Sequence, residues 1–317
     1  MATTYYHHIV CGLMTAAILS CSDSNSIITS DNESKIETVS SVTYSIDKFS
    51  LIEDRPQIQT KVALESETNI IWNDGDTVGI YPNTGAQVYF SIESGGAEYA
   101  SFDGGGWSFK TGSTYSAYYP FIGDIYLDRE CIPVCFSGQE QFTPNGTAHL
   151  GSHLFMYSEP TSVSEGNLNF SFKHLCCIIR ATVTLPAGTY TKFAITAPTD
   201  VFVKKGSYNL AAGNCTIAGS EYTDQIQINL DNCAFENETQ FKIYIAVAPV
   251  NLNGTEITVS VLDSQKKELQ CKKTPSKAYS AGNIYGLSCS TWTEVPQSMG
   301  MIVKDWDDAG TISGDAQ

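Results

Sequence analysis

Cysteines are the residues in this chain whose number and spacing most invite a chemical role, since there are ten of them. Cys131 and Cys135 would lie about 13 Å apart in a straight strand, which is too far for a disulfide without a turn. Cys176 and Cys177 are adjacent, so a strand would point them to opposite faces, and we expect at most one of them in a core. No Cys-x-x-Cys pair occurs, and the sequence therefore predicts no metal site.

Two histidines, His149 and His153, have the spacing of metal ligands on one face of a helix. No glutamate lies between them and no helical pattern surrounds Gly151, so we interpret them as loop or interface histidines. The chain also lacks a Gly-x-Ser-x-Gly nucleophile turn, and the glycines at 104–106 are followed by neither the lysine nor the helix of a phosphate loop. We therefore expect no enzyme, no catalytic residue and no cofactor.

Composition supports a folded, acidic protein. The chain has 317 residues, 42% of them hydrophobic and 11% aromatic, and a net charge of −16. Such a chain has too many aromatics for a disordered protein and lacks the positive field that holds nucleic acid. The lysines clustered between 266 and 277 are interpreted either as edge-strand lysines that oppose aggregation or as an anion-binding patch.

The elements that position these residues are β-strands. Apolar residues along 179–185, 226–230 and 257–261 alternate with polar ones, Arg180 among them, which we expect to face outward. Gly- or Asn-containing turns separate such runs. Many short strands between closely spaced turns predict an all-β fold of two antiparallel β-sandwich domains. We place them at 39–164 and 165–317, with a terminal strand around 301–308.

The N-terminus is typical of an exported protein. Residues 1–20 carry no charged side chain, and the apolar stretch Ile9 to Leu19 has the length of a signal-peptide core. The junction Ser20-Cys21 resembles a bacterial lipobox, which predicts cleavage between these residues and lipidation, including a palmitoyl chain, on Cys21. The polar residues 21–38 then form a flexible tether.

A set of local motifs recurs in a fixed order downstream. The first, Trp-x-x-Gly-Asp-x-x-Gly-x-Tyr, spans residues 72–81, and Tyr-Tyr-Pro follows at 118–120. Phe-Lys-His-Leu lies at 172–175, Ala-Val-Ala-Pro at 246–249 and Ala-Gly-Asn-Ile-Tyr at 281–285. The set ends with Lys-Asp-Trp-Asp-Asp at 304–308. Together with the lipobox, these motifs resemble those of the fimbrillin-like surface lipoproteins of the Bacteroides group.

This resemblance implies two tandem transthyretin-like sandwiches and a lipid-anchored protein of the outer membrane and cell surface. Its implied function is a pilus (fimbrial) subunit, with other pilus subunits as partners and host proteins or glycans as further ones. The alternative is a glycan-binding surface lipoprotein, whose stacking platforms would be Trp107, Tyr115, Tyr118 and Tyr119.

The motif residues also have structural interpretations. We expect Trp72 and Tyr81 in the first core, a hairpin turn at Asp74-Gly75 just before Asp76, and a bulge or close backbone approach at Gly79. His174 is interpreted as a hydrogen-bonded structural histidine and Trp306 as the anchor of the terminal strand.

The resemblance also implies assembly by strand exchange, in which a protease releases a first strand after an arginine. Val42, Tyr44 and Ile46 alternate as such a strand would, and Arg55 is the nearest arginine. Pro56 follows Arg55, which makes a poor trypsin-like site, so we expect a tip or accessory subunit that keeps its first strand rather than a stalk repeat.

Overall fold

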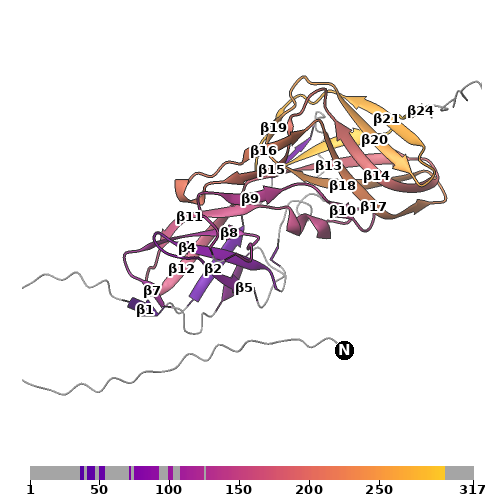
Figure 1. Cartoon of the computed structure of the whole chain (residues 1–317). Helices are drawn as coiled ribbons and strands as arrows, with labels where there is room; N and C mark the ends of the chain where they lie inside the picture. Colours follow the sequence, from indigo (N-terminus) through magenta and orange to yellow (C-terminus); the bar gives the residue numbers. More distant parts are fainter. Residues whose placement is uncertain are drawn as a thin grey trace, which may run out of the picture. The chain divides into compact units, whose positions relative to one another are not determined.

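The structure is a computed structural model that describes residues 36–38, 41–46, 50–53, 71–72, 75–92, 99–102, 108–124 and 126–296 (Figure 1). Ser20, Cys21, Arg55, Trp107 and Trp306 lie outside these residues, as do the signal peptide, most of the tether and the strand expected around 301–308. None of the helices in the described ranges has the length and apolar character needed to cross a bilayer.

The described residues form β-strands and two short 3₁₀ helices, η1 (Ala148–Ser152) and η2 (Leu210–Ala212). The predicted all-β sandwich fold is therefore confirmed. Alternating side chains explain it, because β17 buries every second residue from Ile226 to Leu230 and exposes those between.

The first sheet has seven strands in the order β5-β4-β8-β11-β12-β2-β6. Their bounds are β2 (Ser41–Ile46), β4 (Thr77–Pro82), β5 (Val88–Ser91), β6 (Tyr99–Phe102), β8 (Thr114–Tyr119), β11 (Met156–Ser162) and β12 (Asn167–His174). A separate ribbon pairs β1 (Ile36–Thr38) with β7 (Ser108–Lys110). One core cluster draws its residues from both, including Trp72, Phe90, Phe109 and Phe172.

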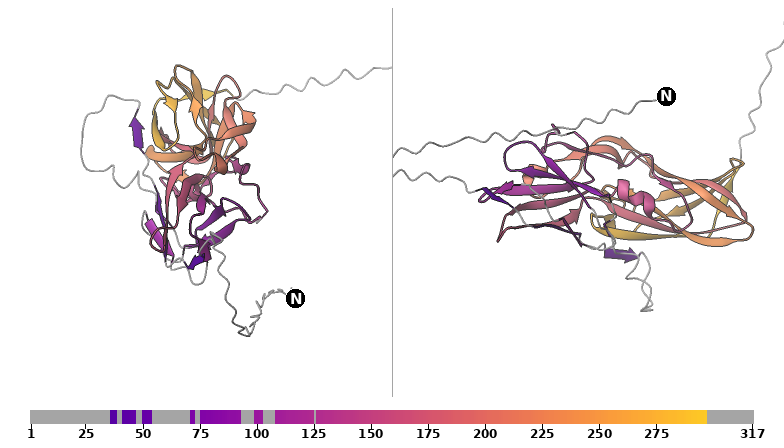
Figure 2. Two further views of the ribbon diagram at one scale, coloured as in Figure 1. Left: turned by 90° about the vertical axis from the view of Figure 1, so that its left-hand side faces the viewer. Right: turned by 90° about the horizontal axis from the view of Figure 1, so that it is seen from below.

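Two further sheets form the C-terminal sandwich, whose strands Figure 2 shows from two other sides. The four-stranded sheet has the order β18-β13-β23-β3, with β3 (Ser50–Glu53), β13 (Cys177–Leu185), β18 (Thr239–Val247) and β23 (Asn283–Cys289). The six-stranded sheet has the order β10-β17-β14-β20-β21-β24, with β10 (Glu140–Gln141), β14 (Gly188–Thr196), β17 (Gln225–Phe235), β20 (Ile257–Asp263), β21 (Glu268–Lys273) and β24 (Thr293–Val295). Phe193, Ile195, Phe241 and Val259 are among the fully buried side chains of its core.

A small three-stranded sheet, β16-β15-β9, accompanies these, with β9 (Ile132–Cys135), β15 (Phe202–Tyr208) and β16 (Ala218–Thr223). A two-stranded ribbon pairs β19 (Val250–Asn251) with β22 (Ala278–Tyr279). Side chains of β9 and β15 join a second cluster that also contains Cys176, Ile178 and Tyr244.

β13 is therefore covered on both faces, which corrects the expectation that at most one of Cys176 and Cys177 lies in a core. Both have no exposed surface, Cys177 in the sandwich core and Cys176 in the second cluster. Arg180, expected on a solvent-facing side, is 7% exposed for the same reason. An alternating pattern shows which side chains share a face, but not whether the other face meets water.

Strands from one half of the chain pair with strands from the other half. β12, which follows the predicted boundary at 164–165, lies in the seven-stranded sheet between β11 and β2. β3 and β10 come from the first half and pair in parallel with β23 and β17. The division into domains at 39–164 and 165–317 stays a prediction.

Candidate functional site

The glycine and aspartate of the first motif hold the end of the β4–β5 hairpin. Gly75 has φ of +82°, a conformation that favours glycine, and its N–H donates to the Ile92 carbonyl at 2.8 Å. The Ile92 N–H donates in turn to the Asp76 carbonyl at 2.7 Å. The Asp76 side chain accepts a hydrogen bond from the Tyr119 hydroxyl at 2.9 Å, which joins the first motif to the Tyr-Tyr-Pro motif.

Trp72 lies at the centre of this cluster and is 1% exposed. Its ring makes edge-to-face contacts with Tyr119 and Phe172, both with centroids 5.4 Å apart. Edge-to-face pairs of this kind add to the stabilisation that comes from burial alone. Three separate motifs of the sequence, those of Trp72, Tyr119 and Phe172, therefore meet in one packed group.

Gly79 is required by the ring of Tyr118. A Cβ atom on Gly79 would lie 2.1 Å from Tyr118 Cε1 and 2.8 Å from Gln87 Oε1. The close neighbour is thus a side chain, not a second backbone. The Tyr118 hydroxyl donates to Gln87 Oε1 at 2.9 Å, and its ring stacks on Tyr81 with centroids 5.9 Å apart. The Tyr81 hydroxyl donates to the Leu127 carbonyl and so fixes the loop that follows β8.

These tyrosines act as permanently protonated donors. Burial raises the pKa of Tyr118, and burial together with the charge of Asp76 raises the pKa of Tyr119. Burial likewise raises the pKa of Tyr81. Tyr115, Tyr118 and Tyr119 are each less than 8% exposed, so the sequence interpretation of these rings as glycan-stacking platforms is wrong. The rings are occupied in packing.

The histidines of the described residues contact backbone carbonyls or lie buried in the fold. His149 lies in η1, is 8% exposed and donates from Nε2 to the Tyr244 carbonyl at 2.9 Å, while His153 Nδ1 lies 3.2 Å from the Cys135 carbonyl. His174 is buried opposite Met156. Among the residues that the structure describes, no group of three or more His, Cys, Asp or Glu is arranged to hold a metal ion.

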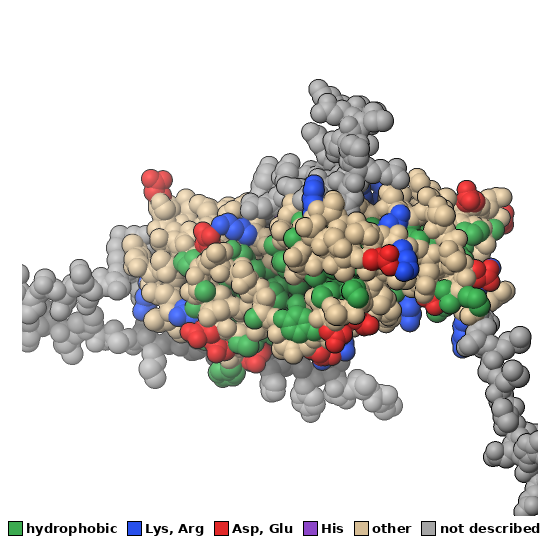
Figure 3. Space-filling model, turned by 90° about the horizontal axis from the view of Figure 1, so that it is seen from above, with side chains coloured by type: hydrophobic (Ala, Val, Ile, Leu, Met, Phe, Trp, Pro, Cys, Tyr) green, Lys and Arg blue, Asp and Glu red, His purple; other side chains and the backbone are tan. Residues whose placement is uncertain are grey.

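Two lysines of the 266–277 cluster are paired with acidic side chains. Lys267 Nζ lies 2.7 Å from Glu294 and Lys272 Nζ lies 2.5 Å from Glu256. β21 is not a sheet edge along Glu268–Gln270, where β24 pairs with it. Figure 3 shows the same mixture on one face of the molecule, where acidic and basic side chains lie next to each other around hydrophobic ones.

One side of the C-terminal sandwich is closed by two buried glutamines. The Gln139 side-chain amide donates to the Ala246 carbonyl and accepts from the Ala246 N–H, both at 2.8 Å. Gln141 does the same with the Lys242 carbonyl at 2.9 Å and the Tyr244 N–H at 3.0 Å. The glutamine side chains thus replace a neighbouring strand along the free edge of β18.

The backbone of the same segment pairs with the other sheet, because β10 runs parallel to β17 with Glu140 opposite Asn229. One segment therefore covers an edge of each sheet. Sequence reasoning missed these glutamines. The signal was their i, i+2 spacing in a short polar strand, which puts both amides on one face.

The opposite edge of the four-stranded sheet is occupied by β3, which pairs in parallel with β23 from Asn283 to Gly286. β2 enters the first sheet in the same manner, parallel to β12 and antiparallel to β6, with Val42 fully buried. Both strands precede Arg55. The two arginines that the structure describes are held by the fold and are poor protease sites. Arg180 is buried, and Arg129 donates to the Pro82 and Asn83 carbonyls.

Comparison with family models gives a match over residues 60–306 to the fimbrillin-like family. The chain belongs to the fimbrillin-like family. The matched range includes the Trp72 motif, the closing glutamines and both sheets of the C-terminal sandwich. Membership makes this fimbrillin-like chain a structural, non-enzymatic protein of the cell surface, a fimbrial subunit or an adhesin.

Solved structures similar to this fimbrillin-like chain include a candidate cell adhesion protein from Bacteroides uniformis ATCC 8492. It is 15% identical with a TM-score of 0.49, and the match covers 71% of this chain and 91% of that one. A candidate cell adhesion protein from Bacteroides ovatus ATCC 8483 is 14% identical with a TM-score of 0.48, covering 80% and 95%. A comparison with curated proteins returned no match.

Proposed function

We propose that this fimbrillin-like chain is a lipid-anchored pilus subunit that acts as a tip or accessory adhesin and keeps its own first strands. Family membership supports the pilus role. The lipobox at Ser20-Cys21 supports an anchor in the outer membrane, because an acyl chain on Cys21 holds a protein to a bilayer without a spanning helix. Its partners are other pilus subunits.

The observation that carries the proposal is that the two edges of the four-stranded sheet are covered in different ways. β18 is closed by side chains from within the chain, whereas β23 is closed by β3, a four-residue strand in parallel pairing. A strand added in parallel needs no hairpin to its neighbour, so a second chain can supply it with the same main-chain hydrogen bonds. Strand exchange would therefore have a suitable edge at β23 only if β3 left, and a subunit that keeps β3 keeps this edge closed.

Retention of the first strands is supported by β2. It lies between β12 and β6, so its loss would leave β12 without a partner on that side and separate β6 from the sheet. Val42, which is fully buried, would leave a cavity in the first core. The bond to be cut is Arg55-Pro56, and proline after arginine disfavours trypsin-like cleavage.

The test is intact mass and N-terminal analysis of the protein taken from its native outer membrane. Acylated Cys21 with the whole chain attached is the expected result. A mature N-terminus at Pro56 would refute retention of the first strands and make the protein a polymerising stalk pilin. If the analysis finds neither of these two N-termini, that result would refute both the lipid anchor and the cleavage site.

A pair of variants tests the same point in the cell. Arg55→Ala should leave incorporation into pili unchanged, because the proposed subunit needs no cut there. Arg129→Ala serves as the matched control, since it removes an arginine that the structure ties to the β4–β5 loop. Loss of the protein from purified pili with Arg55→Ala alone would contradict the proposal.

A further inference from the structure

A pocket of about 470 Å³ lies where the three-stranded sheet meets the start of β17. Its floor contains Phe136 and Ile226, both buried, and its rim is polar and contains Lys204, Asp224 and Gln225. The ring of Tyr222 also lines the pocket and is 51% exposed, which makes it one of the large hydrophobic side chains on the described surface.

The backbone around the pocket is shaped to place these side chains. The pairing of β15 with β16 shifts register between Val203 and Lys205, so Lys204 is an extra residue in the strand. A bulge of this kind redirects a side chain and is frequent beside functional sites. Gly219 allows the ring of Tyr222 to fold back over β16, because a Cβ there would lie 2.5 Å from Tyr222 Cζ.

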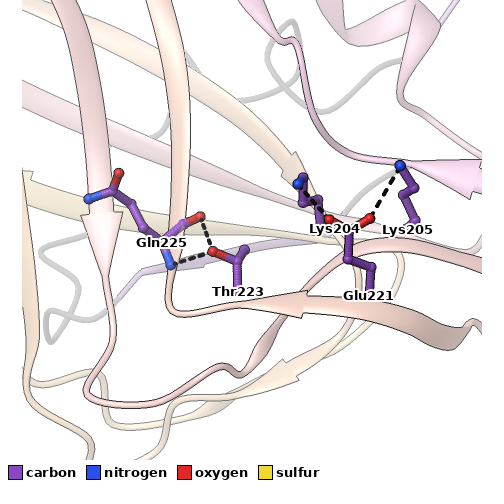
Figure 4. Close-up of polar contacts among 5 residues, drawn as sticks. All are labelled: Lys204, Lys205, Glu221, Thr223 and Gln225. Carbon is purple, nitrogen blue, oxygen red and sulfur yellow. Dashed lines mark hydrogen bonds and ion pairs between the residues drawn. The ribbon is translucent and has the colours of Figure 1, made fainter.

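Charge in the pocket is balanced, which argues against an anionic ligand. Glu221 lies 2.5 Å from Lys204 Nζ and 3.2 Å from Lys205 Nζ (Figure 4). Among the residues that line the pocket, Lys204 and Asp224 carry one charge of each sign, and the Lys204 ammonium is already paired with Glu221 beside the pocket. No surplus positive charge remains to hold a phosphate, a sulfate or a carboxylate sugar.

The polar rim is held in place by its own hydrogen bonds. The Thr223 hydroxyl donates to the Gln225 carbonyl and accepts from the Gln225 N–H, each at 3.2 Å (Figure 4). The Gln225 side chain donates through Nε2 to the Thr196 hydroxyl at 2.9 Å, which fixes the plane of the amide. Fixed donors and acceptors bind a ligand with less loss of entropy than mobile ones.

We propose that this pocket binds a neutral carbohydrate, with the ring of Tyr222 against an apolar face of a sugar ring. Sugars combine apolar C–H faces with hydroxyls that both donate and accept. The pocket offers the matching set, because an exposed aromatic ring lies beside hydrogen-bond donors and acceptors. Lys204 is a donor, Asp224 is an acceptor, and Gln225 can be either.

The inference rests on the proposed function only for the exposure of the pocket at the cell surface. Binding by the purified full chain and incorporation into pili are therefore measured separately. Loss of sugar binding with normal incorporation overturns the carbohydrate site alone. Absence from pili with intact binding overturns the pilus proposal alone.

The experiment applies the full chain to a printed array of neutral oligosaccharides and their sialylated counterparts, and then titrates the strongest neutral glycan against variants. Tyr222→Ala should weaken binding about tenfold, the loss expected when one ring face of apolar contact is removed. Tyr222→Phe keeps the ring and should change binding by about threefold or less. Gln225→Ala should weaken it with no change in folding, because this side chain is exposed.

Tyr126→Ala is the matched control, since Tyr126 is 86% exposed in a loop outside the pocket. Far-UV circular dichroism and a thermal melt show that each variant is folded. Three results would overturn the proposal: no neutral glycan bound, binding confined to sialylated glycans, or binding that Tyr222→Ala and Tyr126→Ala weaken equally.

Discussion

Gly79→Ala should be one of the most damaging single-methyl additions in the chain. The added Cβ would lie 2.1 Å from Tyr118 Cε1 and 2.6 Å from Cζ, far inside contact distance. The Tyr118 ring is fully buried beside Tyr81 and Phe121, so it cannot move away without disturbing them. Overpacking of this kind costs about 1–3 kcal/mol.

The displaced ring would also lose polar contacts. Its hydroxyl donates to Gln87 Oε1 and accepts from the Ile122 N–H, and each such bond contributes about 0.5–1.5 kcal/mol. Adding these to the overpacking term gives an expected loss of about 4 kcal/mol in the free energy of unfolding. That is a large fraction of the total stability of an ordinary domain.

Equilibrium urea unfolding, followed by circular dichroism, measures this loss. The deciding comparison is a double-mutant cycle with Tyr118→Leu, which removes the ring atoms that the new Cβ would meet. In that background Gly79→Ala should cost less than about 1 kcal/mol. The difference between its costs in the two backgrounds is the coupling energy, which is large for residues in direct contact. Gly123→Ala is the control, because nothing lies within 4 Å of its Cβ position and it should be nearly neutral. An equal cost of Gly79→Ala in both backgrounds would refute the reasoning.

Three further predictions follow from buried polar groups. Burial lowers the pKa of His149 and His153 below the ordinary 6.5, so protonation favours the unfolded chain. The free energy of unfolding should therefore be constant above about pH 6.5 and fall as the pH drops below it. Urea titrations from pH 7.5 to 5 measure this, and an unchanged urea midpoint would contradict it. Gln139→Leu should cost about 2–4 kcal/mol, because the Ala246 backbone groups lose their partners, and a midpoint equal to the parent's would disprove the closing role. Maleimide should label exposed Cys135 in the folded protein and leave Cys177 unlabelled until unfolding, since burial raises the Cys177 pKa well above the usual thiol value; mass spectrometry of the labelled peptides decides.

Much of the fold follows from local sequence patterns. The alternation along 179–185, 226–230 and 257–261 predicted strands, and β13, β17 and β20 lie there. Alternation reports on one strand at a time, however, and the covering of the second face of β13 depends on residues far away in the chain. That is why at most one of Cys176 and Cys177 was expected in a core, and why Arg180 was expected to face water.

The candidate site was predicted only in part. The sequence singled out Trp72, Gly75 and Gly79 as a motif, but nothing local shows that the Tyr118 ring is what Gly79 accommodates. The pocket at Tyr222 was missed entirely, because it depends on a bulge in β15 and on the folding of one ring over Gly219. Neither leaves a pattern in the sequence at the scale of a single strand.

Edge closure has a direct consequence for how such a subunit can assemble. The four-stranded sheet ends on β18 and β3, and Gln139 and Gln141 already hydrogen-bond the outer edge of β18. A foreign strand can therefore pair with β23 only if β3 leaves. A chain that retains β2 and β3 therefore has no vacant edge at β12 or β23 to offer. Under the proposed function, a subunit that retains these strands would not accept a donor strand at β12 or β23, and we expect filament growth by strand exchange to stop at it in one direction. Retention of the strands before Arg55 and a terminal position in the filament are thus one physical claim, and the N-terminal analysis tests both at once.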